Sequence, residues 1–459
     1  MPLWTWSDLS LACGDDEPVV GPDISGISID TRTLITGDLF IALSGDPGPR
    51  FKSSIINARD GHEFIKAAES AGAAGLIVSK ASASALPLLK VADTLDGLWL
   101  IGQAGRQRME GKVVAITGSS GKTTARSWLE SILSKQASTH ASVGSLNNHW
   151  GVPLSLARMP ADSVFGVFEI GMNSPGEIEP LSQLVSPDVA IVINVLPAHL
   201  GNFENIEGIR KEKLSISRGL RSGGVLVVHE EIELRDLPVK LQRDKIVTFG
   251  FSQSATVSGE VSYEKDKPHV SVMIAGNQYS FNLSVGGEHR VLTSLACLAA
   301  VYALGADLAQ ACELLPQLEA PVGRGNLIDI AGRIIIDDSY NANPASMKYA
   351  LDALSLVPRG RKIALLGEML ELGDSGKSAH RLMIDSCRSL DGVITVGEGF
   401  AGVGEALGDI HWGHYESVAE LSLADLAEKI EEGDTILVKG SNKVFWVNNF
   451  VEALRSAIG

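Results

Sequence analysis

Cysteine is scarce in this chain of 459 residues. The four cysteines lie far apart, and none shows the Cys-x-x-Cys spacing of a zinc or redox motif: Cys13, Cys297, Cys312 and Cys387. This pattern excludes a disulfide framework and argues against metal ligation by sulfur. We therefore expect reduced core cysteines in a cytosolic protein.

Long apolar runs and an excess of positive charge are also lacking. No uninterrupted apolar run is long enough to span a bilayer, and the first residues show no basic region followed by an apolar one. Lysine and arginine number 39 against 55 aspartates and glutamates, which gives a net charge of −16. This balance disfavours nucleic acid or an anionic membrane as a partner. We expect a soluble, cytoplasmic protein of roughly two to four domains that holds any anionic ligand in a local pocket.

One stretch has the layout of a phosphate-binding loop. An apolar run at 113–116 leads into Gly-x-x-Gly-Lys-Thr, and an amphipathic helical pattern follows. Glycines let backbone N–H groups surround an anion, the helix N-terminus and the lysine add positive charge, and a threonine hydroxyl can hold Mg²⁺. Ile116 stands where the longer form of the motif has glycine. The alternative is a glycine turn between a core strand and a core helix, with the lysine solvated. The residues expected to bind phosphate are Gly118, Ser119, Ser120, Gly121, Lys122, Thr123 and Thr124.

Strand and helix patterns alternate along the chain, which indicates an α/β fold. Before residue 109 we predict strands at 24–29, 39–43 and 75–78 and a helix at 64–71. The next strands are nearly continuous apolar runs, typical of a parallel sheet covered on both faces: 112–117, 164–170, 188–195 and 223–228. A hairpin at 245–285 with a turn at Gly276-Asn277 follows, then helices at 288–304 and 308–315. A second doubly wound unit begins near 321, with strands at 333–337, 361–366, 392–396 and 434–438.

Polar residues follow several of these strands, at the end where α/β proteins bind ligands. Glu169 ends one strand and His199 follows the next. Glu169 could ligate Mg²⁺ near the phosphates or make a structural hydrogen bond. Asp337 and Asp338 are adjacent carboxylates that need hydroxyls or a cation, which favours a nucleotide or substrate contact. Lys439 ends the last strand and could reach a phosphate or point to solvent.

Lys213 lies on the apolar face of a predicted helix at 206–220. The stripe on that face consists of Ile206, Ile209, Ile216 and Leu220. Lys213 falls within it, whereas Lys211 lies about 200° away around the helix. A lysine in such a place commonly extends its amine to water. The alternative is an amine neutral enough to react with CO₂, giving a carbamate that binds Mg²⁺ as a carboxylate would.

Two short segments have local structural interpretations. Asp30-Thr31-Arg32 sets a carboxylate and a guanidinium beside a strand end, which by itself favours a turn salt bridge. Asn343 suits a helix N-cap, and Pro344 suits the first helical position after it.

The combination of motifs resembles the Mur ligases, the ATP-dependent amide-forming enzymes of peptidoglycan precursor synthesis. The resemblance extends over the whole chain. Its most specific strings are Asn-Asn-x-x-Gly-Val-Pro at 147–153 and Asp-Asp-Ser-Tyr-Asn-Ala-Asn-Pro at 337–344. The phosphate loop, Glu-Ile-Gly at 169–171, His199, Lys213 and Leu-Gly-Glu-Met-Leu-Glu-Leu-Gly at 366–373 complete the set.

The resemblance implies a three-domain α/β protein. Its parts would be a small UDP-sugar-binding domain at 1–108, a central P-loop parallel-sheet ATP-binding domain at 109–320 and a Rossmann-like doubly wound domain at 321–459. Within the family, the strings are most similar to the branch that joins D-alanyl-D-alanine to UDP-N-acetylmuramoyl-tripeptide. The Asp-Asn-Pro-Arg string of the branch that adds diaminopimelate or lysine is absent. Two alternatives remain: a family ligase that adds another amino acid or a folate glutamate tail, and a P-loop regulator without chemistry. By default we expect a monomer.

The resemblance also implies roles for single residues. The catalytic residues would be Lys122, Glu169, His199 and Lys213. Thr123 and Glu169 would bind one Mg²⁺, and His199 with carbamoylated Lys213 would bind a second. Asn147 and Asn148 would position this centre. Asp338 would contact the ribose of ATP, and Arg324 would reach the nucleotide from the domain junction. The implied substrate contacts are Asp30, Thr31, Arg32, Tyr340, Asn341 and Asn343.

Three positions depart from the family pattern. Arg290 and Thr293 stand where the family usually has asparagines near the adenine, so adenine recognition is left open. Ser145 stands where asparagine is frequent, which would loosen the loop around Asn147.

Overall fold

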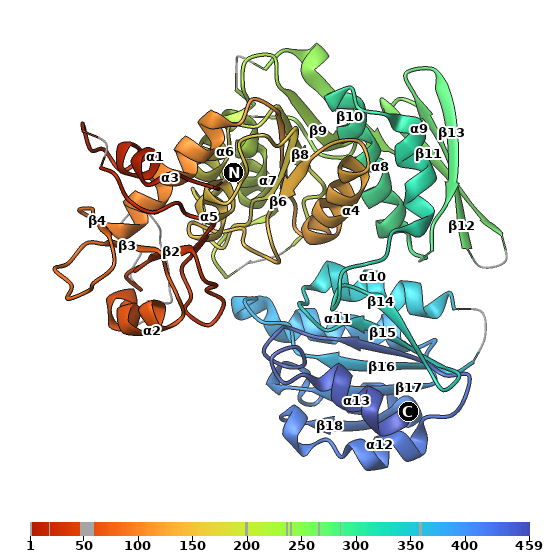
Figure 1. The fold of residues 1–459 in the computed structure, drawn as a ribbon. Helices are drawn as coiled ribbons and strands as arrows, with labels where there is room; N and C mark the ends of the chain where they lie inside the picture. The colour runs from red at the N-terminus through yellow and green to blue at the C-terminus, as the bar shows by residue number, and fades with distance from the viewer. Residues whose placement is uncertain are drawn as a thin grey trace.

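The computed structural model describes residues 2–17, 19–45, 59–197, 201–235, 237–238, 241–264, 267–284, 286–357 and 360–459. Within these residues the chain forms three β-sheets, and each of the three predicted units contains one of them. Figure 1 shows three lobes: an N-terminal one, a central one beside it, and a C-terminal one that lies against the central lobe. The α/β, doubly wound expectation is confirmed, while the domain limits at 108/109 and 320/321 stay predictions.

The N-terminal sheet is small and parallel, in the order β1-β2-β3-β4. Its strands are β1 (Gly26–Ser28), β2 (Asp38–Ile41), β3 (Gly75–Val78) and β4 (Leu88–Lys90), and its helices are α1 (Trp6–Ala12), α2 (Ile65–Ser70) and α3 (Thr94–Arg108). The predicted strands and helix are confirmed, with limits that differ from the predicted ones by at most two residues. The apolar core of this unit also includes Leu154 and Ala157 of the central unit, so the two are packed together.

The central sheet has nine strands in the order β13-β12-β11-β10-β9-β8-β5-β7-β6. They are β5 (Lys112–Thr117), β6 (Thr139–Ala141), β7 (Phe165–Glu169), β8 (Val189–Val192), β9 (Val225–His229), β10 (Ile246–Gly250), β11 (Val257–Glu264), β12 (Lys267–Ile274) and β13 (Asn277–Asn282). In this sheet order, neighbouring strands from β6 to β11 pair in parallel. The pairs β11–β12 and β12–β13, which lie in the predicted hairpin segment, are antiparallel. Val114 and Ile116 face one apolar core, and Val113 and Ala115 face the other. A strand buried on both faces explains the continuous apolar run.

Helices cover both faces of the central sheet (Figure 1). They are α4 (Lys122–Ser134), α5 (Gly151–Ala157), α6 (Ile178–Val185), α7 (Ile206–Leu214), α8 (Glu288–Leu304) and α9 (Leu308–Leu314). The predicted helix at 206–220 is wrong in its second half, because α7 ends at Leu214 and a 3₁₀ segment, Ser215–Gly219, follows. Ile206 is 43% exposed and so does not belong to a buried stripe, whereas Ile209 and Ile216 are buried.

The C-terminal sheet has six strands in the order β14-β15-β19-β16-β17-β18. They are β14 (Asn326–Ile330), β15 (Arg333–Asp338), β16 (Lys362–Gly367), β17 (Gly392–Val396), β18 (His411–Tyr415) and β19 (Thr435–Lys439). Only β14 pairs antiparallel among these described strands. The helices are α10 (Pro344–Ser355), α11 (Gly376–Cys387), α12 (Leu423–Lys429) and α13 (Phe450–Ile458), and they form two cores, one with α10 and α11 and one with α12 and α13.

The start of α10 confirms the predicted cap. The Asn343 side chain accepts from the backbone N–H of Ser346, the Ser346 side chain returns a bond to the Asn343 backbone, and Pro344 occupies the first helical position. This capping box fixes where the chain turns from the end of β15 into the helix. Among the described residues, no helix combines the length and apolarity needed to cross a membrane.

Candidate active site

The phosphate loop joins β5 to α4, as the sequence predicts. Gly121 has φ +78°, a left-handed conformation that glycine adopts without strain, and α4 begins at the next residue. The ammonium of Lys122 turns back over the loop and donates to the carbonyl of Gly118 at 2.8 Å. Burial lowers the pKa of Lys122, the nearby Glu169 opposes this shift, and Arg324 adds to it. The alternative of a fully solvated lysine is therefore wrong.

Asn194 holds this loop in place, and sequence reasoning missed it. Its side-chain oxygen accepts from the backbone N–H groups of Ser119 and Ser120 at 2.9 and 3.0 Å. The residue lies two positions after β8, inside the segment predicted as strand 188–195. An asparagine at the carboxyl end of a strand beside β5 was the signal that could have identified it.

Glu169 joins the loop to the strand beside it. One carboxylate oxygen accepts from the Thr123 hydroxyl at 2.8 Å, and the other accepts from the Asn147 amide at 2.6 Å. Glu169 is buried, at 1% exposure. Gly171 leaves room for Asn147, since a Cβ there would lie 2.8 Å from the Asn147 side chain. A buried carboxylate beside a hydroxyl is a hard oxygen donor set of the kind that Mg²⁺ prefers.

Asn148 has a different local role from Asn147. Its side-chain oxygen accepts from the backbone N–H groups of Trp150 and Gly151, at the start of α5. Among the described residues no group of three His, Cys, Asp or Glu side chains could hold a metal ion. His199, predicted to bind the second Mg²⁺, lies outside the described residues.

Lys213 is fully inside the protein. It is 2% exposed, whereas Lys211 on the same helix is exposed, so the predicted orientation is confirmed and an amine reaching water is excluded. Its Nζ lies 3.8 Å from the sulfur of Met172, a weak acceptor. Burial lowers the pKa of Lys213 well below its usual value, Lys122 adds to the effect and Glu212 opposes it.

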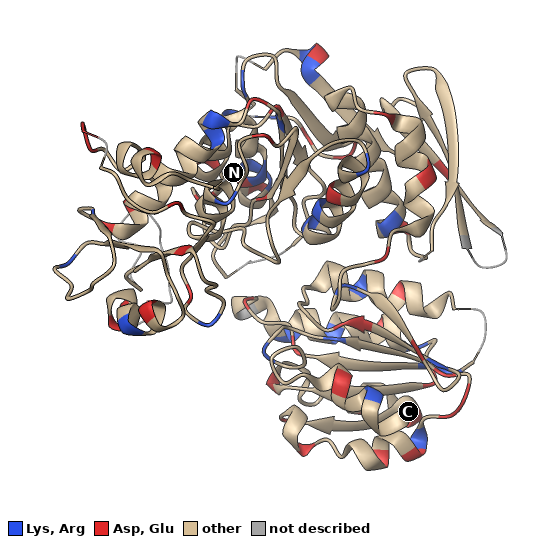
Figure 2. Cartoon of the chain, in the orientation of Figure 1, with Lys and Arg blue, Asp and Glu red and all other residues tan. Residues whose placement is uncertain are grey.

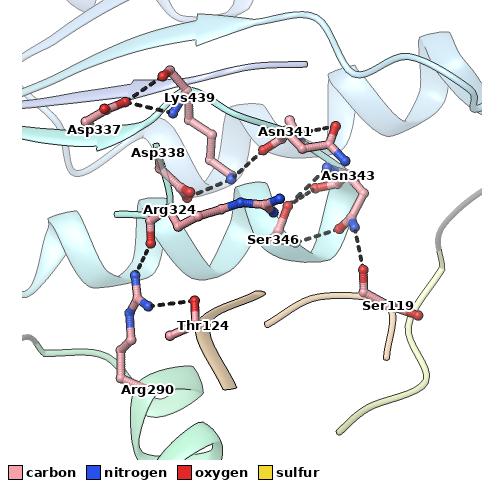
Figure 3. A network of polar contacts seen from close by, with 12 residues as sticks. Ser119, Thr124, Arg290, Arg324, Asp337, Asp338, Asn341, Asn343, Ser346 and Lys439 are labelled. Carbon is pink, nitrogen blue, oxygen red and sulfur yellow. Dashed lines mark hydrogen bonds and ion pairs between the residues drawn. The ribbon is translucent and has the colours of Figure 1, made fainter. Parts of the chain in front are cut away.

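The two carboxylates at the end of β15 meet hydroxyl and cation partners. Asp337 accepts from the Ser339 hydroxyl at 2.5 Å, and burial raises its pKa. Asp338 pairs with the ammonium of Lys439 at 2.7 Å, across neighbouring strands in register (Figure 3). Lys439 also donates to the carbonyl of Asn341 at 3.1 Å and is 1% exposed. Lys439 therefore does not point to solvent; it lines the cleft, and its contact with a phosphate stays a prediction.

Residues of the C-terminal unit reach the phosphate loop (Figure 3). The Asn343 amide donates to the carbonyl of Ser119 at 3.4 Å. The guanidinium of Arg324 lies 4.0 Å from the centre of the Tyr340 ring and donates to the Ser145 hydroxyl at 3.4 Å. The two hydrogen bonds, from Asn343 and from Arg324, connect the C-terminal unit to the central one.

These groups line one cleft of about 1040 Å³ between the central and C-terminal units. The predicted site residues that line it are Ser119, Ser120, Gly121, Lys122, Thr123, Thr124, Asn147, Asn148, Glu169, Arg324, Asp338, Tyr340, Asn341 and Asn343. Acidic and basic residues are interspersed over the three lobes in Figure 2, and the lining of the cleft likewise contains both kinds.

Other predicted residues lie away from the cleft lining. Lys213 does not line it, although its neighbour Met172 does. Asp30, Thr31 and Arg32 are in the N-terminal unit, where Arg32 pairs with Asp30 at 2.6 Å and is 87% exposed. The turn salt bridge favoured by the sequence is therefore present, and the structure does not join these three residues to the other predicted ones.

Comparisons with known proteins agree with this architecture. The description "Mur ligase middle domain" matches residues 116–301, and "Mur ligase, glutamate ligase domain" matches residues 323–442. The UDP-N-acetylmuramoyl-tripeptide–D-alanyl-D-alanine ligase of Bacillus subtilis is 33% identical over 91% of this chain and 90% of its own length. The ligase of the same name from Escherichia coli is 31% identical over 92% of each chain.

Solved structures lead to the same result. MurF from Acinetobacter baumannii has a TM-score of 0.83 and 30% identity, over 99% of this chain and 100% of its own. The MurF ligase from Thermotoga maritima in complex with ADP has a TM-score of 0.78 and 26% identity, over 94% and 97% of the two chains. With sequence identity and three-domain architecture both extending over nearly the whole length, the chain belongs to the Mur ligase family.

Proposed function

We propose that this protein is an ATP-dependent ligase that joins D-alanyl-D-alanine to UDP-N-acetylmuramoyl-tripeptide in the cytoplasm. The product is the pentapeptide precursor of peptidoglycan. One observation carries the proposal: a single cleft brings the phosphate loop together with Arg324, Asp338 and Asn343 of the C-terminal unit. The activity that names the relatives needs this arrangement, because a phosphorylated acceptor and an attacking amine must meet in one place.

The residues of the cleft support a two-step reaction. A carboxylate oxygen of the tripeptide attacks the γ-phosphorus of ATP, and the bond to ADP breaks, giving an acyl phosphate. The dipeptide amine then attacks the acyl carbon, phosphate leaves and the amine loses a proton. Lys122 neutralises charge on the β- and γ-phosphates. Ser119 and Ser120 donate to Asn194, so we assign phosphate binding to the first N–H groups of α4, which have no intrahelical acceptor.

Magnesium fits the donor set at the loop. Thr123 supplies a hydroxyl and Glu169 a buried carboxylate, with 2.8 Å between the hydroxyl oxygen and the nearer carboxylate oxygen. Asn147 orients the carboxylate from the other side. A bound Mg²⁺ would neutralise phosphate charge during transfer. Glu169→Gln should therefore raise the Mg²⁺ concentration needed for half-maximal ADP binding, whereas an unchanged requirement would remove Glu169 from the metal site.

Carbamoylation of Lys213 belongs to the same proposal. Its support is geometric: the amine is buried and its contact is the soft sulfur of Met172, so a neutral amine suits this position better than an ammonium. Intact-protein mass or electron density should show the addition of one CO₂. Lys213→Ala should lose activity and regain part of it with short carboxylates, while Lys211→Ala, on the exposed face of α7, should remain active. Absence of both the added mass and the rescue would leave an unmodified lysine.

The activity itself is tested with purified full-length protein, ATP and Mg²⁺. D-Alanyl-D-alanine with UDP-N-acetylmuramoyl-tripeptide should give ADP and the pentapeptide, identified by mass. Free amino acids and folates as alternative substrates distinguish the other family ligases. A protein that binds nucleotide but releases no ADP with any acceptor would be the P-loop regulator. No turnover with the dipeptide would overturn the proposal.

Substrate binding by the N-terminal unit is tested separately. We assign Asp30, Thr31 and Arg32 to the UDP-sugar and Tyr340, Asn341 and Asn343 to the acceptor end. Arg32 is exposed and already oriented by Asp30, so it can contact a ligand without rearrangement of the core. Arg32→Ala should raise the KM for UDP-N-acetylmuramoyl-tripeptide and leave that for ATP unchanged. Equal KM values for UDP-N-acetylmuramoyl-tripeptide in the variant and the wild type would leave Asp30 and Arg32 with only a structural role in the turn.

A further inference from the structure

Arg290 is a buried cation in the wall of the cleft. It lies in the first turn of α8, is 5% exposed and lines the same cleft as the phosphate loop. One terminal nitrogen of its guanidinium donates to the Thr124 hydroxyl at 3.4 Å, and the other donates to the carbonyl of Arg324 (Figure 3). Its Nε–H has no hydrogen-bond partner among the described residues. A buried arginine that leaves a donor unused beside a phosphate loop has capacity for one more acceptor.

The guanidinium of Arg290 is bonded to neutral oxygens and forms no ion pair among the described residues. Burial lowers its pKa, Asp338 opposes this and Arg324 adds to it. Asp338 is already paired with Lys439, and Glu169 is held by Thr123 and Asn147. Three cations, Lys122, Arg290 and Arg324, line the cleft and donate to hydroxyl and carbonyl oxygens. The cleft lining also contains other glutamates, but within the described residues none of them forms an ion pair with these three cations. Buried charge without a partner is costly, so an anion bound between them would stabilise the site.

The position of Arg290 selects which part of the nucleotide it would meet. In a phosphate loop of this kind the lysine serves the β- and γ-phosphates. Arg290 instead contacts Thr124, one residue further into α4 than the Thr123 that meets Glu169. Thr293, one turn along α8, lies on the same side: its hydroxyl is 3.5 Å from where a Cβ on Gly121 would be. The face of α8 that carries Arg290 and Thr293 therefore packs beside the start of α4.

We propose that Arg290 is a ligand of the α-phosphate of the bound nucleotide. This inference rests on the proposed function in so far as that function requires ATP in this cleft. The guanidinium has a fixed fork of donors that matches a phosphate. Its bond to the carbonyl of Arg324 holds the fork at the domain junction, and Gly325 makes room for it, since a Cβ there would lie 2.5 Å from the Arg290 guanidinium. The nucleotide thereby compensates the buried charge and links α8 to the junction.

The test compares binding of adenosine, AMP and ADP to wild-type protein and Arg290→Met by calorimetry or competition with a fluorescent nucleotide. The variant should bind AMP and ADP at least about ten-fold more weakly, as expected for a lost hydrogen bond to a charged group, and bind adenosine as the wild type does. Arg126→Met is the matched control. Arg126 is also buried, at 8% exposure, and its Nε–H likewise has no partner among the described residues, but it pairs with Glu130 and does not line the cleft.

The outcomes separate this inference from the proposed function. Wild-type protein that fails to bind ADP would overturn the proposed function. Two results would contradict the inference while the wild type binds ADP: an unchanged affinity of Arg290→Met for AMP and ADP, or an equal weakening of adenosine, AMP and ADP binding. Either would leave Arg290 with only its structural bond to the carbonyl of Arg324. Should Arg290→Met not fold, Arg290→Lys replaces it. A loss in that variant confined to the phosphorylated ligands supports the proposal, and a loss shared by adenosine contradicts it.

Discussion

Replacing Asp338 by asparagine should destabilise the protein more than replacing its partner Lys439 by methionine. The two side chains face each other across β15 and β19 at 2.7 Å. Their burial differs, because the Lys439 side chain is 2% exposed and that of Asp338 is 21% exposed. The cost of breaking such a pair depends on which charge is left behind.

Asp338→Asn leaves an ammonium buried with neutral acceptors, Asn341 among them. An uncompensated buried charge of this kind costs about 3–5 kcal/mol. The same substitution also removes the carboxylate that attracts the buried guanidinium of Arg290 and opposes the lowering of its pKa. Lys439→Met removes the buried charge itself. The carboxylate of Asp338 that remains is partly exposed to water and is still attracted by Arg290. Its cost should be about 1–2 kcal/mol, for the ion pair and the bond to Asn341.

Thermal unfolding of the full chain measures both variants. At about 2–4 °C per kcal/mol, Asp338→Asn should lower Tm by about 10 °C and Lys439→Met by only a few degrees. The double variant should be more stable than Asp338→Asn alone, because the stranded ammonium is gone. Lys348→Met is the control, since its pair with Asp352 is exposed at both ends and should contribute well under about 1 kcal/mol. A Lys439→Met variant as unstable as Asp338→Asn would refute the reasoning.

Three further predictions concern the loop, the junction and pH. Asn194→Ala should weaken ADP binding about ten-fold, because two loop N–H groups lose their acceptor; unchanged affinity in calorimetry would show that the loop holds its shape alone. Gly325→Ala, at φ +84° and against Arg290, should lower Tm and ADP affinity together, and an effect on neither would contradict the packing. Burial next to Arg290 and Lys439 lowers the pKa of His289 to about 3, so the unfolded chain binds a proton below pH 6.5 that the folded one does not. Stability should therefore fall by up to about 1.4 kcal/mol per pH unit from pH 6.5 to 5, and urea unfolding of His289→Phe should lack this part of the slope.

Much of the fold could be predicted because the relevant signals are local. The strand β5 is apolar at successive positions since residues of both parities are buried, and that property is visible in the sequence alone. The cap of α10 could be predicted for the same reason, because Asn343, Pro344 and Ser346 lie within four residues. The end of α7 could not, because its switch to a 3₁₀ segment depends on packing against α6, where the Ser182 hydroxyl donates to the carbonyl of Ile216.

The site residues also differ in whether a local signal in the sequence identifies them. Residues that belong to one loop or to one strand end could be identified, and most of them line the cleft; Gly118 does not, and His199 lies outside the described residues. Asn194, Arg290 and the pairing of Lys439 depend on which strands and helices become neighbours. Lys439 meets Asp338 only because β19 lies beside β15, about a hundred residues apart in the chain. A lysine at a strand end carries no sign of its partner, so the sequence left its role open.

The two junctions of the central unit differ in strength. Toward the N-terminal unit the contacts are short: the Trp4 indole donates to the carbonyl of Ala157 at 2.8 Å, and the Arg158 guanidinium donates to the carbonyl of Ile27 at 2.6 Å. A shared apolar core lies behind them. These two units should therefore move as one body.

Toward the C-terminal unit, Arg290 bonds closely to the carbonyl of Arg324, but two other direct contacts at the cleft are long. Asn343 to Ser119 and Arg324 to Ser145 are both 3.4 Å, near the limit of a hydrogen bond. Bonds of that length hold a domain weakly, and relative motion is the ordinary behaviour of such an interface. The cations that face the cleft then matter for more than affinity, because a nucleotide bound between Lys122 on one side and Arg324 on the other replaces long protein contacts with charged ones. Nucleotide binding should accordingly draw the C-terminal unit onto the central one, and water would be excluded at the stage when an acyl phosphate has to survive until the amine arrives.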